Sequence, residues 1–239
     1  ADLTRLHVLL GELYADAIDH ALRASGLTAP LELIGCHGQT VYHQGEAQPY
    51  LGRPIAGTLQ IGEPAAMAER FGVPVVSDFR PRDMAAGGKG APLVPFLDYL
   101  VFSDATMPRI ALNIGGISNL TAIPAGARPE AIIAFDTGPG NMVMDSLIRR
   151  ATGGRETFDE GGRLARRGRS IEEFVERELA SNPYYTAAPP KTAGREQYGD
   201  VMVSTLESTG RPIEDLLATA AQLTARSIAF GVRRFALPC

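Results

Sequence analysis

The stretch Ala134-Phe135-Asp136-Thr137-Gly138-Pro139-Gly140-Asn141 brings a carboxylate to the end of an apolar segment, directly before a helix-forming run. We expect a strand at residues 131–135 and a helix at 141–151. Ligands of α/β proteins bind at such strand ends, and the N-terminus of a helix favours an anion. Asp136 is therefore placed to take a proton from a water or hydroxyl nucleophile. The competing interpretation is that Asp136 caps the turn through its own backbone.

A pair of glycines precedes this stretch. The segment Asn113-Ile114-Gly115-Gly116-Ile117-Ser118-Asn119 predicts a strand that enters a tight turn and a second strand that leaves it. Without Cβ atoms, the backbone N–H groups of the two glycines can approach an anion such as phosphate. Gly-Gly also favours an ordinary two-residue hairpin turn, so both interpretations stay open. With residues 131–135, the two strands predict a meander sheet.

The rest of the chain alternates helices and strands, which is typical of an α/β fold with a parallel component. Residues 80–92 are predicted to form a loop, residues 187–198 a proline-rich linker, and residues 104–109 a boundary between domains 1–106 and 107–239. Further helices are expected at residues 3–25, 63–71, 93–102, 162–168, 171–179 and 213 to about 235. Further strands are expected at 31–36, 58–61, 73–77, 109–114 and 118–123, with a short strand between the first two of these.

Composition excludes several classes of protein. The 239 residues carry a net charge of −4 with scattered arginines, so nucleic acid is not an expected partner. Cys36 and Cys239 lie too far apart in sequence to suggest a disulfide framework, and no His/Cys cluster has zinc-ligand spacing, which favours a cytoplasmic protein. No apolar run approaches the roughly 20 residues that span a bilayer, so no membrane association is expected.

Two polar clusters follow predicted strands in the first domain. Ser77-Asp78-Phe79-Arg80 combines a carboxylate with a guanidinium, which can hydrogen-bond sugar hydroxyls and a substrate carboxylate. A structural Asp–Arg pair that holds the loop is the alternative. His37-Gly38-Gln39-Thr40 offers donors and acceptors for a polar ligand, although an isolated histidine is more often structural.

Six segments together resemble the anhydro-N-acetylmuramic acid kinase family in their order and spacing. They cover nearly the whole chain: residues 36–43, residues 77–80 with 87–95, residues 113–119, residues 135–141, residues 158–161, and residues 189–191 with 194–196. The resemblance implies two ribonuclease-H-like domains of the actin/hexokinase-like (sugar kinase) superfamily with a central cleft. It also implies an enzyme that uses ATP and Mg²⁺ to phosphorylate O6 of 1,6-anhydro-N-acetylmuramic acid while water opens the anhydro bridge, giving N-acetylmuramic acid 6-phosphate in peptidoglycan recycling.

The resemblance also implies roles for individual residues. Asp136 would be the general base that activates the attacking water. The sugar would be bound by His37, Gln39, Asp78 and Arg80. The phosphate groups of ATP would be bound by Asn113, Gly115, Gly116, Asn119, Gly138 and Asn141. No metal ligand is implied, and a homodimer is compatible with the prediction.

The chain departs from the family pattern in several places. It lacks the Gly-Thr-Ser and Asp-Gly phosphate motif that opens similar kinases and the glycine-rich adenosine motif that follows their long helix, so we expect a piece of a longer enzyme. Lys89 stands where the family usually has glutamine, and Thr192-Ala193 where it usually has Ser-Thr. Two other functions stay open: another kinase of the superfamily, such as a sugar kinase or an acetate-kinase-like enzyme, and a module that binds sugar without catalysis.

Overall fold

The computed structural model describes residues 1–237, with only the backbone of Arg195 and Glu196, so Cys239 lies outside the described residues. The chain forms two compact units, and the boundary between them in the sequence lies between Leu93 and Val94. The predicted boundary lay at residues 106/107. The units divide the chain earlier because α4 (Val94–Phe102) contacts the sheet of the second unit. The Thr121 hydroxyl, on that sheet, donates to Asp98 of α4 at 2.6 Å.

The first unit is built on the predicted N-terminal helix. This helix, α1 (Asp2–Ser25), ends at Gly26, whose left-handed φ of 64° suits a helix C-terminus. It packs against α2 (Pro64–Phe71). The predicted parallel component is confirmed, since β1 (Ile34–Gly35) pairs in parallel with β4 (Val75–Val76), although both strands are shorter than expected. The core of this unit is small, with four buried hydrophobic residues: Ala15, Ile34, Cys36 and Met67.

A long antiparallel hairpin follows β1, formed by β2 (Gln39–Tyr50) and β3 (Arg53–Ile61). Its turn residues Leu51 and Gly52 both have positive φ, as a primed hairpin turn requires. The sequence indicated a strand only at residues 58–61 and a short one before it. Most of the hairpin is exposed on both faces, so it lacks the alternation of apolar and polar residues that marks a half-buried strand.

The expected loop at residues 80–92 begins instead with helix α3 (Phe79–Ala85). Pro81 is compatible with this helix because it lies in the first turn, where no intrahelical N–H bond is lost. After α3 the loop is held by Asp83, whose carboxylate accepts from the Gly90 N–H at 2.7 Å. The prediction of a loop at residues 80–92 was therefore wrong for residues 80–85.

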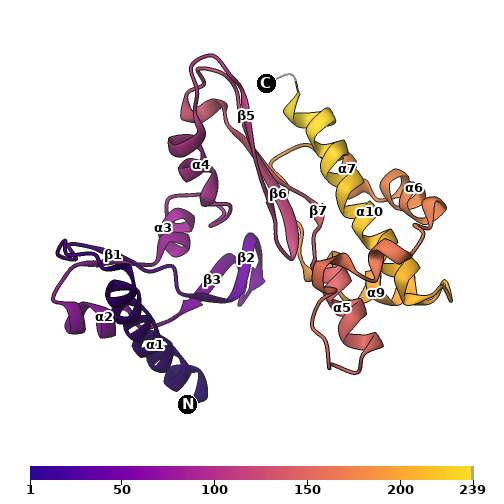
Figure 1. Ribbon diagram of the computed structural model, residues 1–239. Coiled ribbons are helices and arrows are strands. Elements are labelled where there is room, and N and C mark those ends of the chain that lie inside the picture. Colours follow the sequence, from indigo (N-terminus) through magenta and orange to yellow (C-terminus); the bar gives the residue numbers. More distant parts are fainter. Residues whose placement is uncertain (238–239) are drawn as a thin grey trace. The chain divides into compact units, whose positions relative to one another are not determined.

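The second unit contains the predicted meander sheet, with β5 (Arg109–Ile114), β6 (Ile117–Ile123) and β7 (Ile133–Pro139) in that spatial order (Figure 1). All pairings are antiparallel. The long helix α10 (Ile213–Gly231) packs against β6 and β7 and continues as a π-helical turn, Val232–Ala236.

The remaining helices of the second unit agree in part with the sequence. The helices α5 (Met142–Ala151) and α6 (Glu172–Ser181) were expected. The predicted helix at 162–168 is replaced by two 3₁₀ turns, because Gly161 and Gly162 take positive φ. Three helices were missed: α7 (Pro183–Thr186), α8 (Arg195–Tyr198) and α9 (Asp200–Glu207). The core that joins these helices includes Leu147, Ile148, Val175, Tyr185, Val203, Leu206, Leu217 and Leu223.

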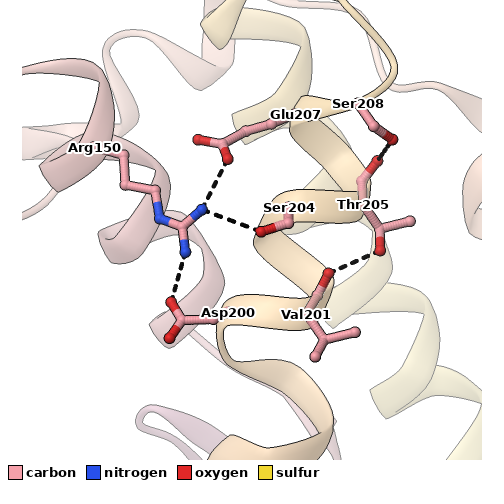
Figure 2. Close-up of polar contacts among 7 residues, drawn as sticks. All are labelled: Arg150, Asp200, Val201, Ser204, Thr205, Glu207 and Ser208. Atoms are coloured by element: carbon pink, nitrogen blue, oxygen red, sulfur yellow. Dashed lines mark hydrogen bonds and ion pairs between the residues drawn. The ribbon is translucent and has the colours of Figure 1, made fainter.

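One arginine joins α5 to α9 (Figure 2). The guanidinium of Arg150, at the end of α5, donates to Asp200 at 2.6 Å, to Glu207 at 2.8 Å and to Ser204 at 3.3 Å. All three acceptors lie on α9. A single exposed ion pair contributes little to stability, but a guanidinium shared by two carboxylates fixes the positions of both helices.

We expect Arg150→Met to lower the melting temperature, and to lower it more at low salt than at high salt because exposed ion pairs are screened. The matched control is Arg149→Met, since Arg149 is also exposed on α5 but forms no ion pair with the described residues. Equal melting temperatures for the two variants, measured by calorimetry at both salt concentrations, would contradict the role of Arg150.

Candidate active site

Three polar residues form one row across the strands of the second unit. Asn113 of β5 pairs with Asn119 of β6, and Asn119 pairs with Asp136 of β7. Residues that pair directly across an antiparallel sheet project from the same face. The row therefore brings together three of the residues predicted to form the site. Asp136 lies inside β7, whereas the sequence placed it just beyond the end of a strand.

A β-bulge lies next to this row. Ser118 pairs with Gly138 while the adjacent Asn119 pairs with Asp136, so Thr137 is an extra residue on β7. The Thr137 and Ser118 hydroxyls are buried and lie 2.6 Å apart, so that one donates to the other, and each also lies within hydrogen-bond distance of a backbone oxygen. Bulges bend a strand and change the direction of the side chains around them, and they recur beside active sites. The direction of Asp136 relative to the strand end is thus set by buried hydroxyl contacts.

Asp136 is held by three hydrogen bonds to the segment that follows α6. Its backbone N–H donates to the Lys191 carbonyl at 3.0 Å, and its carbonyl accepts from the Tyr184 hydroxyl at 2.6 Å. One carboxylate oxygen, Oδ2, accepts from the Ala193 N–H at 2.8 Å. The other, Oδ1, has no partner among the described residues. The side chain therefore does not cap its own turn, which was the competing interpretation of this stretch.

Burial raises the pKa of the Asp136 carboxyl, and the hydrogen bond from Ala193 opposes that rise. Desolvation disfavours the charged form, so the carboxylate of Asp136 is more basic than an exposed one. A carboxylate with one oxygen fixed and the other free has the geometry of a general base. The donor to Oδ2 is a backbone N–H group, so the departure of the Ala193 side chain from the family pattern leaves this bond intact.

The predicted glycine hairpin is tied to the start of α5 through its carbonyl groups. The Gly115 carbonyl accepts from the Asn141 N–H at 2.8 Å, and the Gly116 carbonyl accepts from the Gly140 N–H at 2.9 Å and the Met142 N–H at 3.3 Å. These three N–H groups are thus already engaged. The free anion-binding capacity predicted for this helix start is correspondingly smaller, and it rests on the N–H groups of the hairpin and on those further into α5.

The fold itself does not require glycine at positions 115 and 116. Neither residue has a positive φ. A Cβ atom added to Gly115 would lie 3.7 Å from the Ile117 carbonyl oxygen, and one added to Gly116 would lie 3.6 Å from the Cβ of Met142, and both distances are ordinary contacts. Gly140 differs, because an added Cβ would overlap the Gly115 carbonyl oxygen. Packing within the chain therefore does not account for the glycine pair.

The two other predicted phosphate residues of this region differ from each other. Gly138 is buried with φ of 145°, and an added Cβ would press on Ser227 and Tyr185, so packing explains this glycine. Asn141 is exposed at the start of α5, and its side chain makes no capping bond. The Asn141 side chain is therefore free to bind a ligand, whereas Gly138 has a packing role within β7.

A cavity of about 200 Å³ lies in the first unit and contains two of the predicted sugar residues, His37 and Asp78. Asp78 has a left-handed φ of 57°, and its side chain does not cap α3, so its carboxylate stays available to the cavity. The other lining residues are His7, Cys36, Gly38, Gln60, Gly62, Glu63, Pro64 and Ser77.

Arg80 does not form the structural pair with Asp78 that the sequence allowed. Its Nε donates to His37 Nε2 at 2.8 Å and its Nη1 to the Gly90 carbonyl at 2.6 Å. His37 Nδ1 lies 2.8 Å from the Gly38 carbonyl, which can only accept, so the ring carries its hydrogen on Nδ1. Burial lowers the pKa of the Arg80 guanidinium. Gln39 is exposed, donates to the Thr40 carbonyl and does not line the cavity.

Sequence reasoning missed two residues of this cavity. His7 of α1 accepts from the Gly62 N–H at 3.0 Å and lies 3.1 Å from the Glu63 carboxylate. Glu63 also accepts from the Ala65 N–H as the N-cap of α2, and this bond is the main cause of its lowered pKa. A lone histidine in an amphipathic helix carries no signal of such a contact across 55 residues. Glu63 was visible only as a helix start.

The described residues include no group of three or more His, Cys, Asp or Glu side chains placed to hold a metal ion. Among the same residues, we find no helix that is both long and apolar enough to traverse a bilayer.

The mixed α/β fold, with a glycine hairpin beside an aspartate on one sheet, is consistent with a sugar kinase. The family model for anhydro-N-acetylmuramic acid kinase matches residues 1–238, so the chain belongs to that family. Curated relatives with the name anhydro-N-acetylmuramic acid kinase include those of Caldanaerobacter subterraneus subsp. tengcongensis and Gloeobacter violaceus, both 44% identical over 99% and 98% of this chain. The relative from Bacillus thuringiensis subsp. konkukian is 40% identical over 98% of the chain.

The chain spans 61%, 61% and 60% of the lengths of these three relatives. The similarity thus covers nearly all of this sequence, while the relatives contain further residues that the sequence does not match.

The glycines of the hairpin region allow a matched test. Gly140→Ala is expected to destabilise the chain by about 1–3 kcal/mol, because its Cβ overlaps backbone that cannot move aside easily. Gly116→Ala is expected to leave stability within about 0.5 kcal/mol, because its Cβ meets only ordinary contacts. Urea unfolding of both variants measures the difference. Equal midpoints would contradict the distinction between a packing glycine and a free one.

Proposed function

We propose that the complete protein is an ATP-dependent anhydro-N-acetylmuramic acid kinase that opens the 1,6-anhydro bridge with water and phosphorylates O6. The observation that carries the proposal is the Asp136 carboxylate, which is buried, held at Oδ2 and free at Oδ1, in a cross-strand row that leads to a glycine hairpin. Membership of the family and the names of the curated relatives support it. The product, N-acetylmuramic acid 6-phosphate, would enter peptidoglycan recycling in the cytoplasm.

In this proposal Asp136 takes a proton from a water molecule that attacks C1 of the sugar. The C1–O6 bond breaks, and the released O6 attacks the γ-phosphoryl group of ATP, so that ADP leaves. One base is sufficient, because the acceptor oxygen is freed by the same step that consumes the water. The raised pKa of Asp136 strengthens it as a base, and the hydrogen bond from the Ala193 N–H favours its ionised form.

The proposed phosphate contacts are Asn113, Gly115, Gly116, Asn119 and Asn141. Gly138 would support them through its packing against Ser227 and Tyr185. The fit of a phosphate group is supported by the glycine pair Gly115 and Gly116, at which the packing of the chain would also accept a Cβ atom in ordinary contact. Phosphoryl transfer depends on such backbone donors and on Mg²⁺, which neutralises charge on the phosphate groups when it is bound. Mg²⁺ in such sites is held largely by phosphates and water, with one or two carboxylates from the protein.

The proposed sugar contacts in the first unit are His37, Asp78 and Arg80. Gln39, which does not line the cavity, is proposed as a further contact. Arg80 Nη2 has no partner among the described residues, so the guanidinium can still bind an anionic group of the sugar. We further propose that the two units are parts of ribonuclease-H-like domains that close over a central cleft, which would bring the sugar to Asp136.

The direct test is an assay of the complete protein with ATP and anhydro-N-acetylmuramic acid, N-acetylmuramic acid or glucosamine. Phosphorylation of the anhydro sugar supports the proposal. Turnover of only the other two sugars would indicate another sugar kinase, and sugar binding without turnover would indicate a binding module.

In the same assay, Asp136→Asn should lower kcat by about 10²–10⁴-fold, the range of general-base catalysis, with KM for the sugar within about tenfold. The rate of the wild type should fall as pH drops through the raised pKa of Asp136, because the base must be ionised. Since burial penalises the charged carboxylate, the neutral asparagine should not destabilise the fold at pH 7. A variant with more than a few per cent of the wild-type rate would remove Asp136 from this role.

Arg80→Met should raise KM for the anhydro sugar by about 10–100-fold, as expected for loss of a charged hydrogen bond, with a smaller change in kcat. Arg82→Met is the control, because Arg82 is exposed on the same helix. If both variants keep the wild-type KM, Arg80 has only the structural role shown by its bonds to His37 and Gly90.

A further inference from the structure

The segment 187–194 lies against Asp136 although it follows it by some fifty residues. It provides two of the bonds that hold Asp136: the Lys191 carbonyl accepts from the Asp136 N–H, and the Ala193 N–H donates to Oδ2. This segment has no strand or helix of its own between α7 and α8. Apart from these bonds to Asp136, its position depends on the side-chain contacts of the segment.

Lys191 makes the polar side-chain contacts of that segment with the body of the unit. Its ammonium group donates to the Tyr184 carbonyl at 2.9 Å and the Tyr185 carbonyl at 3.0 Å, both near the C-terminal end of α7. The end of a helix exposes such carbonyls and favours a cation. The segment is thus pinned two residues before Ala193.

Aromatic rings surround the same ammonium group. It lies 4.6 Å from the ring centroid of Phe235, 4.8 Å from that of Tyr184 and 5.6 Å from that of Phe135. Phe135 directly precedes Asp136 on β7, and the Tyr184 hydroxyl donates to the Asp136 carbonyl. A partly desolvated cation is attracted by ring faces. Lys191 therefore contacts Phe135, which precedes Asp136 in the strand, and Tyr184, which binds the Asp136 carbonyl.

We propose that Lys191 is a positioning residue for Asp136: its ammonium group fixes the segment 187–194 so that the Ala193 N–H stays on Oδ2 and Oδ1 stays free. This inference rests on the proposed role of Asp136 as the base. Lys191 is assigned no contact with the sugar or ATP and acts only through the segment that it holds.

Partial burial of the Lys191 ammonium group disfavours its charged form. Desolvation lowers the pKa of Lys191 to about 8. An apolar side chain of the same length would fill the space among the rings without that cost, but it would remove the side-chain donor from the Tyr185 carbonyl and leave the Tyr184 carbonyl with only the Ala187 N–H, at 3.3 Å. The ammonium group is thus explained by the hydrogen bonds that it makes rather than by packing.

The test is a titration of the carboxyl groups of this chain, labelled with ¹³C at the aspartate side chains and followed by NMR, with Asp136→Asn used to assign the signal. Lys191→Met keeps the shape of the side chain and removes its donors. We expect the pKa of Asp136 to rise by about one unit, because the bond from Ala193 favours the charged form and is worth about that much. Amide exchange at Ala193 should accelerate by about tenfold.

The matched control is Arg177→Met, because Arg177 also lies over an aromatic ring, that of Phe174 at 5.6 Å, but on α6 and away from the segment. It should change neither quantity. If Lys191→Met does not fold, Lys191→Gln, which keeps an NH₂ donor group on a shorter side chain, should give a smaller rise in the same direction. An unchanged Asp136 pKa and unchanged Ala193 exchange in a folded Lys191 variant would overturn the proposal.

The titration needs neither substrate nor turnover, so it separates this inference from the proposed function. In the complete enzyme, Lys191→Met should lower kcat, leave KM for the sugar nearly unchanged and move the acid limb of the pH profile upward. If Asp136→Asn retains activity while the titration behaves as expected, the positioning contact stands and the proposed base does not.

Discussion

The antiparallel pairing of β6 with β7, interrupted by one bulge, is the feature on which the candidate site depends. The bulge places Thr137 out of register, so that Asp136 pairs with Asn119 while Gly138 pairs with Ser118. Beyond it, the chain turns into α5, whose first N–H groups bind the carbonyls of the glycine hairpin. The aspartate and the hairpin are therefore parts of one hydrogen-bonded unit, and a shift in one is transmitted to the other.

Asp136 lies where this unit meets a segment from a distant part of the sequence. Strand β7 supplies its backbone, and the segment 187–194 supplies the bond to its carboxylate. Two elements that approach from different sides restrict a side chain more than either alone does. This arrangement explains how a buried carboxylate can keep one oxygen without a protein partner.

The sequence predicted the parts of the fold that have regular periodicity. The helix at α1, the meander β5–β7 and the helix α10 were all found within a few residues of their expected bounds. The hairpin β2–β3 was missed because its faces are mostly exposed, and α9 was missed beside a proline-rich linker. Asp136, His37 and the glycines could be proposed as site residues because glycine and polar residues at strand ends are local signals. Contacts such as His7 with Glu63, or Ala193 with Asp136, join residues more than fifty positions apart, and no local pattern shows them.

The two units differ in the size of their cores. Four buried hydrophobic residues form the core around α1 and α2, whereas the helices of the second unit share a core more than three times as large. Local opening requires less free energy where less apolar surface is buried. The half of the chain that contains the His37 cavity should thus be the more easily opened, and a ligand that binds there adds its binding free energy to the stability of that half. Sugar binding would then be coupled to the ordering of its own pocket, while the half that contains Asp136 depends on its larger core.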